Sequence, residues 1–207
     1  MKGVCIFIVA ILIGGPACAE QRGVFPIDEK GSSGVSAFES DWYGGLLARL
    51  GEPSIMAVQT NVFAVYRFTL VPTWGNPVCV RLTISNGVAR VEGKRLDGQG
   101  GYDPGELVEQ GTTAVASEQL KRFSVLFEKL GFHELKTRDK DRGLDGSEWI
   151  LEAADAGRYH IVVRWSPTAY DPRKRGTLDF VNVCECLYRI SPLKADVRNK
   201  GKVELAK

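Results

Sequence analysis

The stretch of residues 78–96 restricts the fold of this chain more than any other. In residues 78–84, Val, Val, Leu and Ile alternate with Cys, Arg and Thr, which is the period of a strand with one buried face. Asn86-Gly87 follows directly, and this pair favours a tight turn between two antiparallel strands. Residues 88–96 then return as the partner strand. The chain is therefore expected to build an antiparallel sheet with a core on at least one side.

Three further strands and one turn-rich segment are predicted. Residues 62–71 form one strand on their own, while residues 147–153 and 158–165 form a second hairpin. Between these groups, residues 97–113 contain many turn-forming residues and are expected to hold no strand.

The second hairpin is expected to turn through a three-residue loop, Asp155-Ala-Gly157. In that register Glu152 faces His160 and Glu148 faces Arg164. We prefer it because it places every aromatic residue of both strands, including Trp149 and Trp165, on one face of the sheet.

Apolar spacing predicts three helices, at residues 39–50, 117–130 and 178–190. Ser117 is expected to cap the second helix and Gly131 to end it. The predicted fold class is α+β. It is a single domain over residues 37–193, in the order αβββαββα, with an antiparallel sheet of two hairpins plus one strand covered by about three helices.

The first 19 residues have the features of a secretory signal peptide. Lys2 precedes a short apolar run, and Ala17 and Ala19 give small residues for cleavage after position 19. A lipid anchor on Cys18 is the alternative. Residues 20–36 are expected to be a disordered leader and residues 194–207 a flexible charged tail. The predicted location is therefore periplasmic or secreted, with no membrane span.

Charge and cysteine content exclude several classes of protein. A net charge of +2 provides no electrostatic basis for strong nucleic-acid binding. Cys184 and Cys186 point about 200° apart on a helix, so they do not bridge each other, and Cys184 is expected on the apolar side. A bridge between Cys79 and Cys184 is expected only if that helix covers the Cys79 side of the sheet. No cofactor-binding motif is present, since the glycines at 98–101 lack the dinucleotide spacing.

Residues 141–152 partly match a calcium-binding loop. Asp141, Asp145 and Glu152 occupy the first, fifth and twelfth positions, and Gly146 occupies the sixth. Gly143, however, supplies no ligand at the third position, and a strand is expected where the calcium motif needs a helix. A glycine-rich turn is the favoured interpretation, and a calcium-stabilised domain is the alternative.

The second hairpin also carries the candidates for acid–base catalysis. A carboxylate facing His160 orients an imidazole and favours its protonated form, so His160, Glu152, Arg164 and Glu148 form a possible cluster. Opposite charges that face each other across a hairpin are also routine sheet stabilisers. No nucleophile motif accompanies the cluster.

The remaining candidates are aromatic residues that suit the binding of a protein, peptide or glycan: Trp42, Tyr43, Tyr102, Trp165 and Tyr170. The expected function is a non-catalytic binding domain, and a hydrolase-like enzyme is the alternative. A binding domain should show an exposed aromatic patch, whereas an enzyme should hold His160 and Glu152 in one pocket.

Three sequence signatures support a family resemblance: GGYDPG at residues 100–105, GLDGxxWILE at 143–152 and GxYHxxxRWSP at 157–167. With them the chain resembles a group of small exported bacterial proteins of unknown function. The resemblance implies export, and it implies no substrate, cofactor or catalytic residue.

Overall fold

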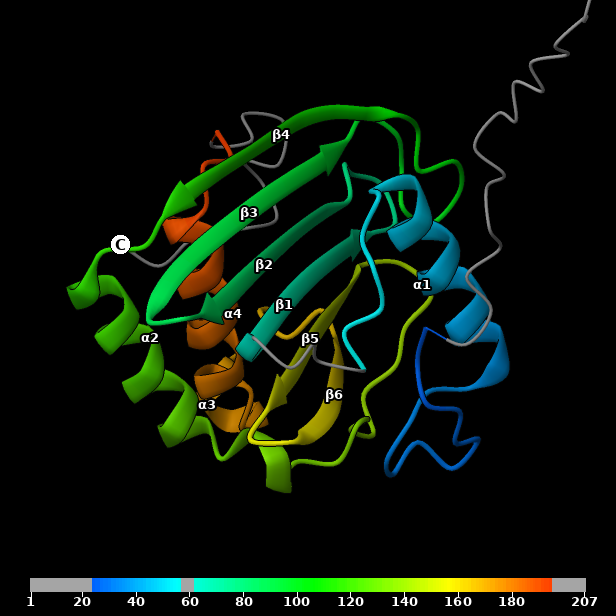
Figure 1. Cartoon of the computed structure of the whole chain (residues 1–207). Helices are drawn as coiled ribbons and strands as arrows, with labels where there is room; N and C mark the ends of the chain where they lie inside the picture. Colours follow the sequence, from blue (N-terminus) through cyan, green and yellow to red (C-terminus); the bar gives the residue numbers. More distant parts are fainter. Residues whose placement is uncertain (1–23, 57–61, 195–207) are drawn as a thin grey trace, which may run out of the picture.

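The computed structural model describes residues 24–56 and 62–194. They form an α+β domain around a six-stranded antiparallel sheet in the order β4-β3-β2-β1-β5-β6 (Figure 1). The strands are β1 Val62–Pro72, β2 Val78–Ser85, β3 Val88–Leu96, β4 Leu107–Ala114, β5 Ser147–Asp155 and β6 Arg158–Trp165. The helices are α1 Ala37–Arg49, α2 Ser117–Leu130, α3 Pro172–Arg175 and α4 Leu178–Ile190, with the short 3₁₀ turn η1 Phe132–Glu134.

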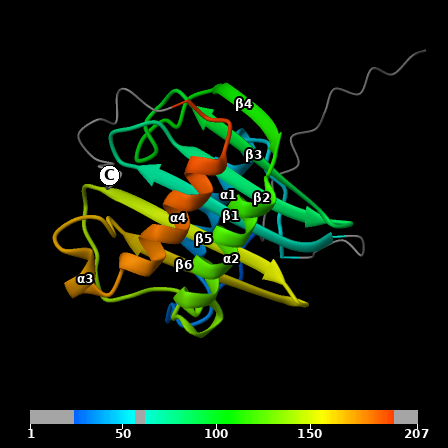
Figure 2. The same ribbon diagram turned by 90° about the vertical axis from the view of Figure 1, so that its left-hand side faces the viewer.

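Helices cover both faces of the sheet. Helices α2 and α4 lie over one face, and α1 lies over the other (Figure 2). The first face buries a core that includes Phe68, Leu82 and Trp149 against Phe123 and Leu187. The second buries a smaller core. Members of this second core are Tyr43, Leu46, Leu47, Leu50, Val71, Ile150 and Ile161. Strands β1 and β5 are covered on both sides as a result, and most of their residues are buried.

Local signals explain the helix ends. Ser36 caps α1, because its Oγ accepts from the Glu39 N–H while the Glu39 carboxylate accepts from the Ser36 N–H. The N-cap of helix α2 lies one residue earlier than predicted, since Ala116 holds the cap position and Ser117 is the first helical residue. Gly131 ends α2 with φ +60°, a left-handed conformation that suits glycine.

The α+β class and the antiparallel sheet are confirmed, but the predicted element order lacked a strand. Leu107–Ala114 forms β4 inside the segment expected to be turns. Strand β4 lies at the sheet edge, and all of its residues are exposed or half-buried. Without a buried face it needs no apolar alternation, so the sequence pattern gave no signal for it.

The predicted register of the second hairpin is wrong by one residue. The turn is Ala156-Gly157, with φ +47° and +75°, so Glu152 pairs with Ile161 and Ala153 pairs with His160. Trp149 pairs with Arg164, and Trp165 pairs with Glu148. Paired residues share a face, so Trp149 and Trp165 lie on opposite faces. The rule that collected all aromatic residues on one face failed because this hairpin is covered on both sides.

The condition for a bridge between Cys79 and Cys184 is not met, because α4 covers the opposite face of the sheet from Cys79. Both cysteines are free and buried, and they belong to different cores on opposite faces of the sheet. Cys184 is fully buried, as expected for the apolar side of α4. Cys186 is buried as well, at 7% exposure, because α2 covers its side of α4.

Within the described residues, no helix is long and apolar enough to cross a membrane. The predicted signal peptide, its cleavage site and the charged tail beyond Lys194 lie outside the described residues.

Candidate functional site

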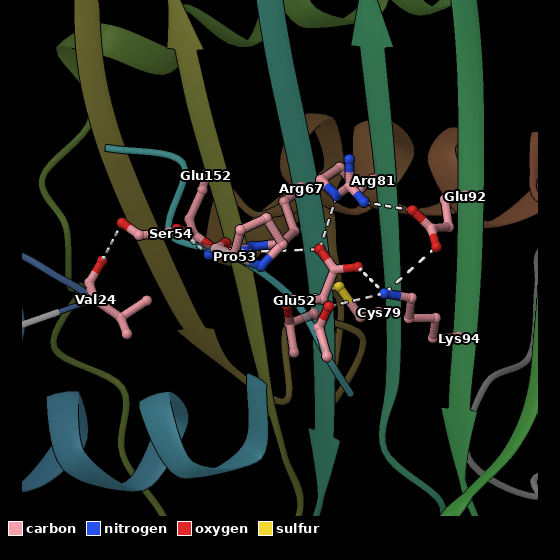
Figure 3. A network of polar contacts seen from close by, with 12 residues as sticks. Val24, Glu52, Pro53, Ser54, Arg67, Cys79, Arg81, Glu92, Lys94 and Glu152 are labelled. Carbon is pink, nitrogen blue, oxygen red and sulfur yellow. Dashed lines mark hydrogen bonds and ion pairs between the residues drawn. The ribbon is translucent and has the colours of Figure 1, made fainter. Parts of the chain in front are cut away.

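A network of buried charges lies on the face of the sheet that α1 covers, and at its centre Arg67 on β1 pairs with Glu152 on β5 (Figure 3). Both side chains are fully buried. Arg67 Nε and Nη2 donate to the two Glu152 oxygens at 2.6 and 2.8 Å, a bidentate arrangement. Tyr159 Oη donates to Glu152 Oε1 at 2.9 Å. Both carboxylate oxygens of Glu152 therefore accept hydrogen bonds on the face of the sheet that α1 covers.

Glu52, which follows the end of α1, is the second centre of the network. Its carboxylate lies 2.8 Å from Arg81 Nε, 2.8 Å from Lys94 Nζ and 3.8 Å from Arg67 Nη1. Burial alone would raise the pKa of Glu52, but the facing Arg81, Lys94 and Arg67 hold that pKa below its usual value. Glu52 is thus a buried carboxylate that stays ionised because three cations surround it.

Two backbone contacts tie the network to the segment after α1. Arg67 Nη1 donates to the Pro53 carbonyl at 2.6 Å, and Lys94 Nζ donates to the Gly51 carbonyl at 3.2 Å. Glu92 completes the network by pairing with Arg81 and Lys94. Three acidic and three basic side chains face one another, so their formal charges balance. The network fixes the end of α1 on the sheet.

A second arginine holds the other end of α1. The guanidinium of Arg138 donates to Tyr43 Oη at 2.7 Å and pairs with Glu39, both on α1. It also lies 3.4 Å from Glu148 on β5. Burial, and then the neighbouring Glu148, raise the pKa of Tyr43, so its hydroxyl stays protonated and neutral. Helix α1 is therefore anchored to the sheet at both ends.

An exposed group of large apolar side chains lies beside this anchored helix. We call it the aromatic surface and define it by Phe38, Trp74, Tyr102 and Leu144, whose exposures are 74%, 52%, 65% and 99%. Phe38 is on α1, and the other three come from the β1–β2 turn, the β3–β4 loop and the loop before β5. These loops meet at one end of the sheet, since Pro72 pairs with Ser147 and the β3 end lies beside the β2 start.

Contacts between the loops hold the aromatic rings in place. The Trp74 and Tyr102 rings lie 4.9 Å apart between centroids, and Trp74 Nε1 donates to Asp145 Oδ1 at 3.3 Å. The Trp42 and Phe38 rings lie 6.2 Å apart between centroids in a tilted arrangement, and Trp42 Nε1 donates to the Gly100 carbonyl at 3.2 Å. The rings are thus linked in a row from α1 to the loop before β5. Such a surface is already ordered before a ligand arrives.

The β3–β4 loop has two further attachments. Arg49, at the end of α1, donates to the Gly105 carbonyl at 3.1 Å and lies 3.4 Å from Asp103. Gly100 packs against the β1–β2 turn so closely that an added Cβ would lie 2.8 Å from the Pro72 carbonyl oxygen. Glycine is needed there because of this close approach.

The four residues proposed for acid–base catalysis do not come together. His160 lies on the opposite face from Glu152 and shares a 2.7 Å hydrogen bond with the Leu135 carbonyl. Arg164 donates to the carbonyls of residues 136, 137 and 163, and Glu148 faces Arg138. Burial lowers the pKa of His160, which opposes the protonated form that the predicted cluster required.

A different histidine has a carboxylate partner. His133 Nε2 lies 2.7 Å from Asp155 Oδ1, and Tyr66 Oη donates to the other Asp155 oxygen at 3.2 Å. A groove of about 560 Å³ lies elsewhere, between α2 and α4, and neither histidine lines it. His133, Asp155 and Tyr66 lie far apart in the sequence, so no short motif marks this group of residues.

The three carboxylates of the proposed calcium loop have separate partners. Asp141 Oδ2 pairs with Arg175 at 2.8 Å, Asp145 accepts from Trp74, and Glu152 is buried against Arg67. Within the described residues, no three His, Cys, Asp or Glu side chains are grouped to hold a metal ion. Glu152 points into the sheet, because a residue in the middle of a strand cannot turn back to the preceding loop.

The residues proposed for binding divide into three groups. Tyr102 and Tyr170 are exposed, and Trp42 and Trp165 are half-buried. Tyr43 is a core residue, so its assignment as a binding residue is wrong. Phe38, Trp74 and Leu144 were missed, since an apolar residue in a loop or on a helix has no sequence mark that separates a surface position from a core position.

Comparison with models of protein families, with curated proteins and with solved structures finds no match to this chain.

Proposed function

We propose that this protein is a non-catalytic binding domain that acts outside the cytoplasm and binds a protein or peptide through the aromatic surface. The observation that carries the proposal is the row of exposed large side chains at Phe38, Trp74, Tyr102 and Leu144. Exposed apolar groups normally occur singly, and a group of them on ordered loops is typical of a binding surface. Trp and Tyr are also the residues that contribute most to protein interfaces.

The composition of the surface favours a protein or peptide over a glycan. Phe38 and Leu144 have no side-chain hydrogen-bonding group, and the Trp74 indole N–H already donates to Asp145. A glycan presents many hydroxyls, which need convergent polar partners. A partner that inserts apolar side chains between Trp74 and Leu144 matches this surface better.

The anchoring of α1 supports the same proposal. Immobilising a flexible surface on binding costs free energy, and a surface already held in place avoids part of that cost. Glu52 and Arg138 attach α1 to the sheet, and Trp42 and Arg49 attach the β3–β4 loop to α1. The buried charges thus favour binding indirectly, because they help to hold α1 in place before a partner binds.

Export is part of the proposal and depends on the first 19 residues and on the resemblance to small exported bacterial proteins. The separation of His160 from Glu152 removes the geometric basis of the hydrolase alternative. A periplasmic or secreted partner follows from this proposed location.

Affinity capture with matched variants tests the proposal. The wild-type protein, Trp74→Ala with Tyr102→Ala, and Val125→Ala are used in parallel with periplasmic extract, and captured proteins are quantified by mass spectrometry. Val125 is 58% exposed on α2, so it controls for loss of an exposed apolar side chain elsewhere. We expect a partner that wild type and Val125→Ala retain and the double variant loses, confirmed by titration of the purified partner. Equal capture by all three proteins would refute the aromatic surface as the binding surface.

A further inference from the structure

The groove between α2 and α4 lies on the face of the sheet opposite α1 (Figure 2). The two helices run antiparallel, since Lys129 near the end of α2 pairs at 2.7 Å with Asp179 near the start of α4. Gln119, near the start of α2, and Ile190, at the end of α4, line the same groove. Its volume of about 560 Å³ falls within the ~300–1,000 Å³ that small-molecule sites occupy. The groove is therefore large enough for a small ligand.

Two arginines give the groove a positive charge. Arg122 on α2 and Arg189 on α4 both line it, together with one carboxylate, that of Glu185. Two positive charges and one negative charge leave a formal charge of +1. Glu185 pairs with Arg189 at 3.2 Å, and no carboxylate among residues 24–56 and 62–194 pairs with Arg122. Arg122 can therefore pair with an anion that enters the groove.

The Cys186 thiol in the wall of the groove reports the same positive charge. Burial raises the pKa of Cys186, while Arg122 and Arg189 each lower that pKa through their positive charge. Both guanidiniums therefore act on one buried sulfur atom of the groove wall. An anion placed beside Cys186 would be attracted by the same two charges.

Amide and apolar side chains complete the groove. Gln119, Arg122 and Leu126 follow one another at spacings of three and four residues, so they share one face of α2. The Gln119 side-chain oxygen accepts from the Ala116 N–H at 3.0 Å, which leaves the Gln119 amino group as a donor toward a ligand. Asn182 adds a second amide. Leu126 provides an apolar wall one helical turn beyond Arg122.

We propose that this groove binds a small monocarboxylate with an apolar chain, whose carboxylate pairs with Arg122 and whose chain lies against Leu126 and Cys186. A planar guanidinium matches a carboxylate with two parallel hydrogen bonds. Charge selects the occupant, because one carboxylate neutralises the formal charge of +1. A phosphate dianion would leave excess negative charge beside Glu185, and a cation would be repelled by Arg122. The site is independent of the proposed function, since it shares no residue with the aromatic surface.

An NMR titration of the purified protein with four probes tests the proposal. Octanoate, octan-1-ol and octylamine share one chain and differ in the charge of the head group, and acetate has the same carboxylate without the chain. We expect octanoate to bind with a dissociation constant on the order of 1 mM, and to shift the amide signals of the groove residues of α2 and α4. The other three probes should bind at least about fivefold more weakly.

Two matched variants identify the residue that binds the carboxylate. Arg122→Gln removes the proposed partner, and Lys121→Gln removes the same charge from the neighbouring position of α2, which does not line the groove. Both positions are exposed, and far-UV circular dichroism checks that each variant is folded. We expect octanoate to bind Arg122→Gln at least about fivefold more weakly than wild type, and Lys121→Gln within about twofold of wild type.

Alkylation of Cys186 in the wild-type protein provides a second measurement. Octanoate at about five times its dissociation constant should slow the modification of Cys186 about fivefold, because the bound chain covers the thiol. Octan-1-ol or octylamine binding as tightly as octanoate would overturn the proposal, and so would unchanged binding by Arg122→Gln. Octanoate that shifts no groove residue, or that leaves the alkylation rate of Cys186 unchanged, would overturn it as well.

Discussion

Replacing Arg67 with methionine should destabilise the protein strongly, because it leaves a buried carboxylate without its cation. Arg67 is fully buried and makes two hydrogen bonds to Glu152 and one to the Pro53 carbonyl. In Arg67→Met, Glu152 keeps only the Tyr159 hydroxyl as a hydrogen-bond donor. Breaking a buried ion pair in this way costs about 3–5 kcal/mol of unfolding free energy. For a domain of this size, that corresponds to a fall in Tm of about 6–20 °C.

Urea unfolding at pH 7, followed by tryptophan fluorescence, measures this loss, and a double-mutant cycle identifies its cause. Arg67→Met with Glu152→Leu removes both charges, so the double variant should lose much less stability than the two single losses added together. Arg49→Met is the control, since Arg49 is half exposed and its ion pairs should contribute under about 1 kcal/mol. A loss below about 1 kcal/mol for Arg67→Met, or additive losses in the double variant, would refute the reasoning.

Three other predictions concern Glu52, the late cysteines and the β5–β6 turn. The cations around Glu52 hold its pKa below the unfolded value of ~4.3, so the contribution of Glu52 to the unfolding free energy is present above that pH and is lost as the pH falls through the folded pKa. The difference in unfolding free energy between wild type and Glu52→Gln should therefore shrink from pH 7 to pH 3. A difference that stays constant over this range would contradict the prediction. Burial raises the pKa of both Cys184 and Cys186, so alkylation of the native protein should be slow. Mass mapping should find Cys186 modified first, because Cys186 is 7% exposed and Cys184 is fully buried. Earlier labelling of Cys184 would show that α2 and α4 pack differently. Ala156 has φ +47°, so Ala156→Asn should raise the unfolding free energy by about 0.5–1 kcal/mol in the same urea assay, and a fall would show that the turn is not strained.

The two hairpins show what the sequence could predict. The β2–β3 register was predictable because Asn86-Gly87 accepts positive φ at both positions, and the structure has +49° and +75° there. The β5–β6 turn has nearly the same angles, but alanine holds the first position. Alanine rarely adopts this conformation, so the sequence favoured a three-residue loop over a two-residue turn. The longer predicted loop moved every predicted pair of the hairpin by one residue.

The buried charges could not be predicted for a different reason. Glu152 and Arg67 stand in otherwise apolar strands, where a charged residue normally indicates a solvent-exposed position. Their burial depends on the pairing of β1 with β5, across 85 positions of sequence, and on Glu52 after α1. Only the three-dimensional fold brings these charges together.

Site-specific photo-cross-linking in cells that express the protein tests the proposed binding function most directly. A photoreactive phenylalanine analogue replaces Tyr102 in one variant and Val125 in another, both of which are exposed positions. The proposed function predicts a discrete cross-linked protein from position 102, none from position 125, and loss of the adduct when Trp74→Ala is added. Absence of any adduct at position 102, or an adduct only at position 125, would contradict the assignment of the aromatic surface as the binding surface.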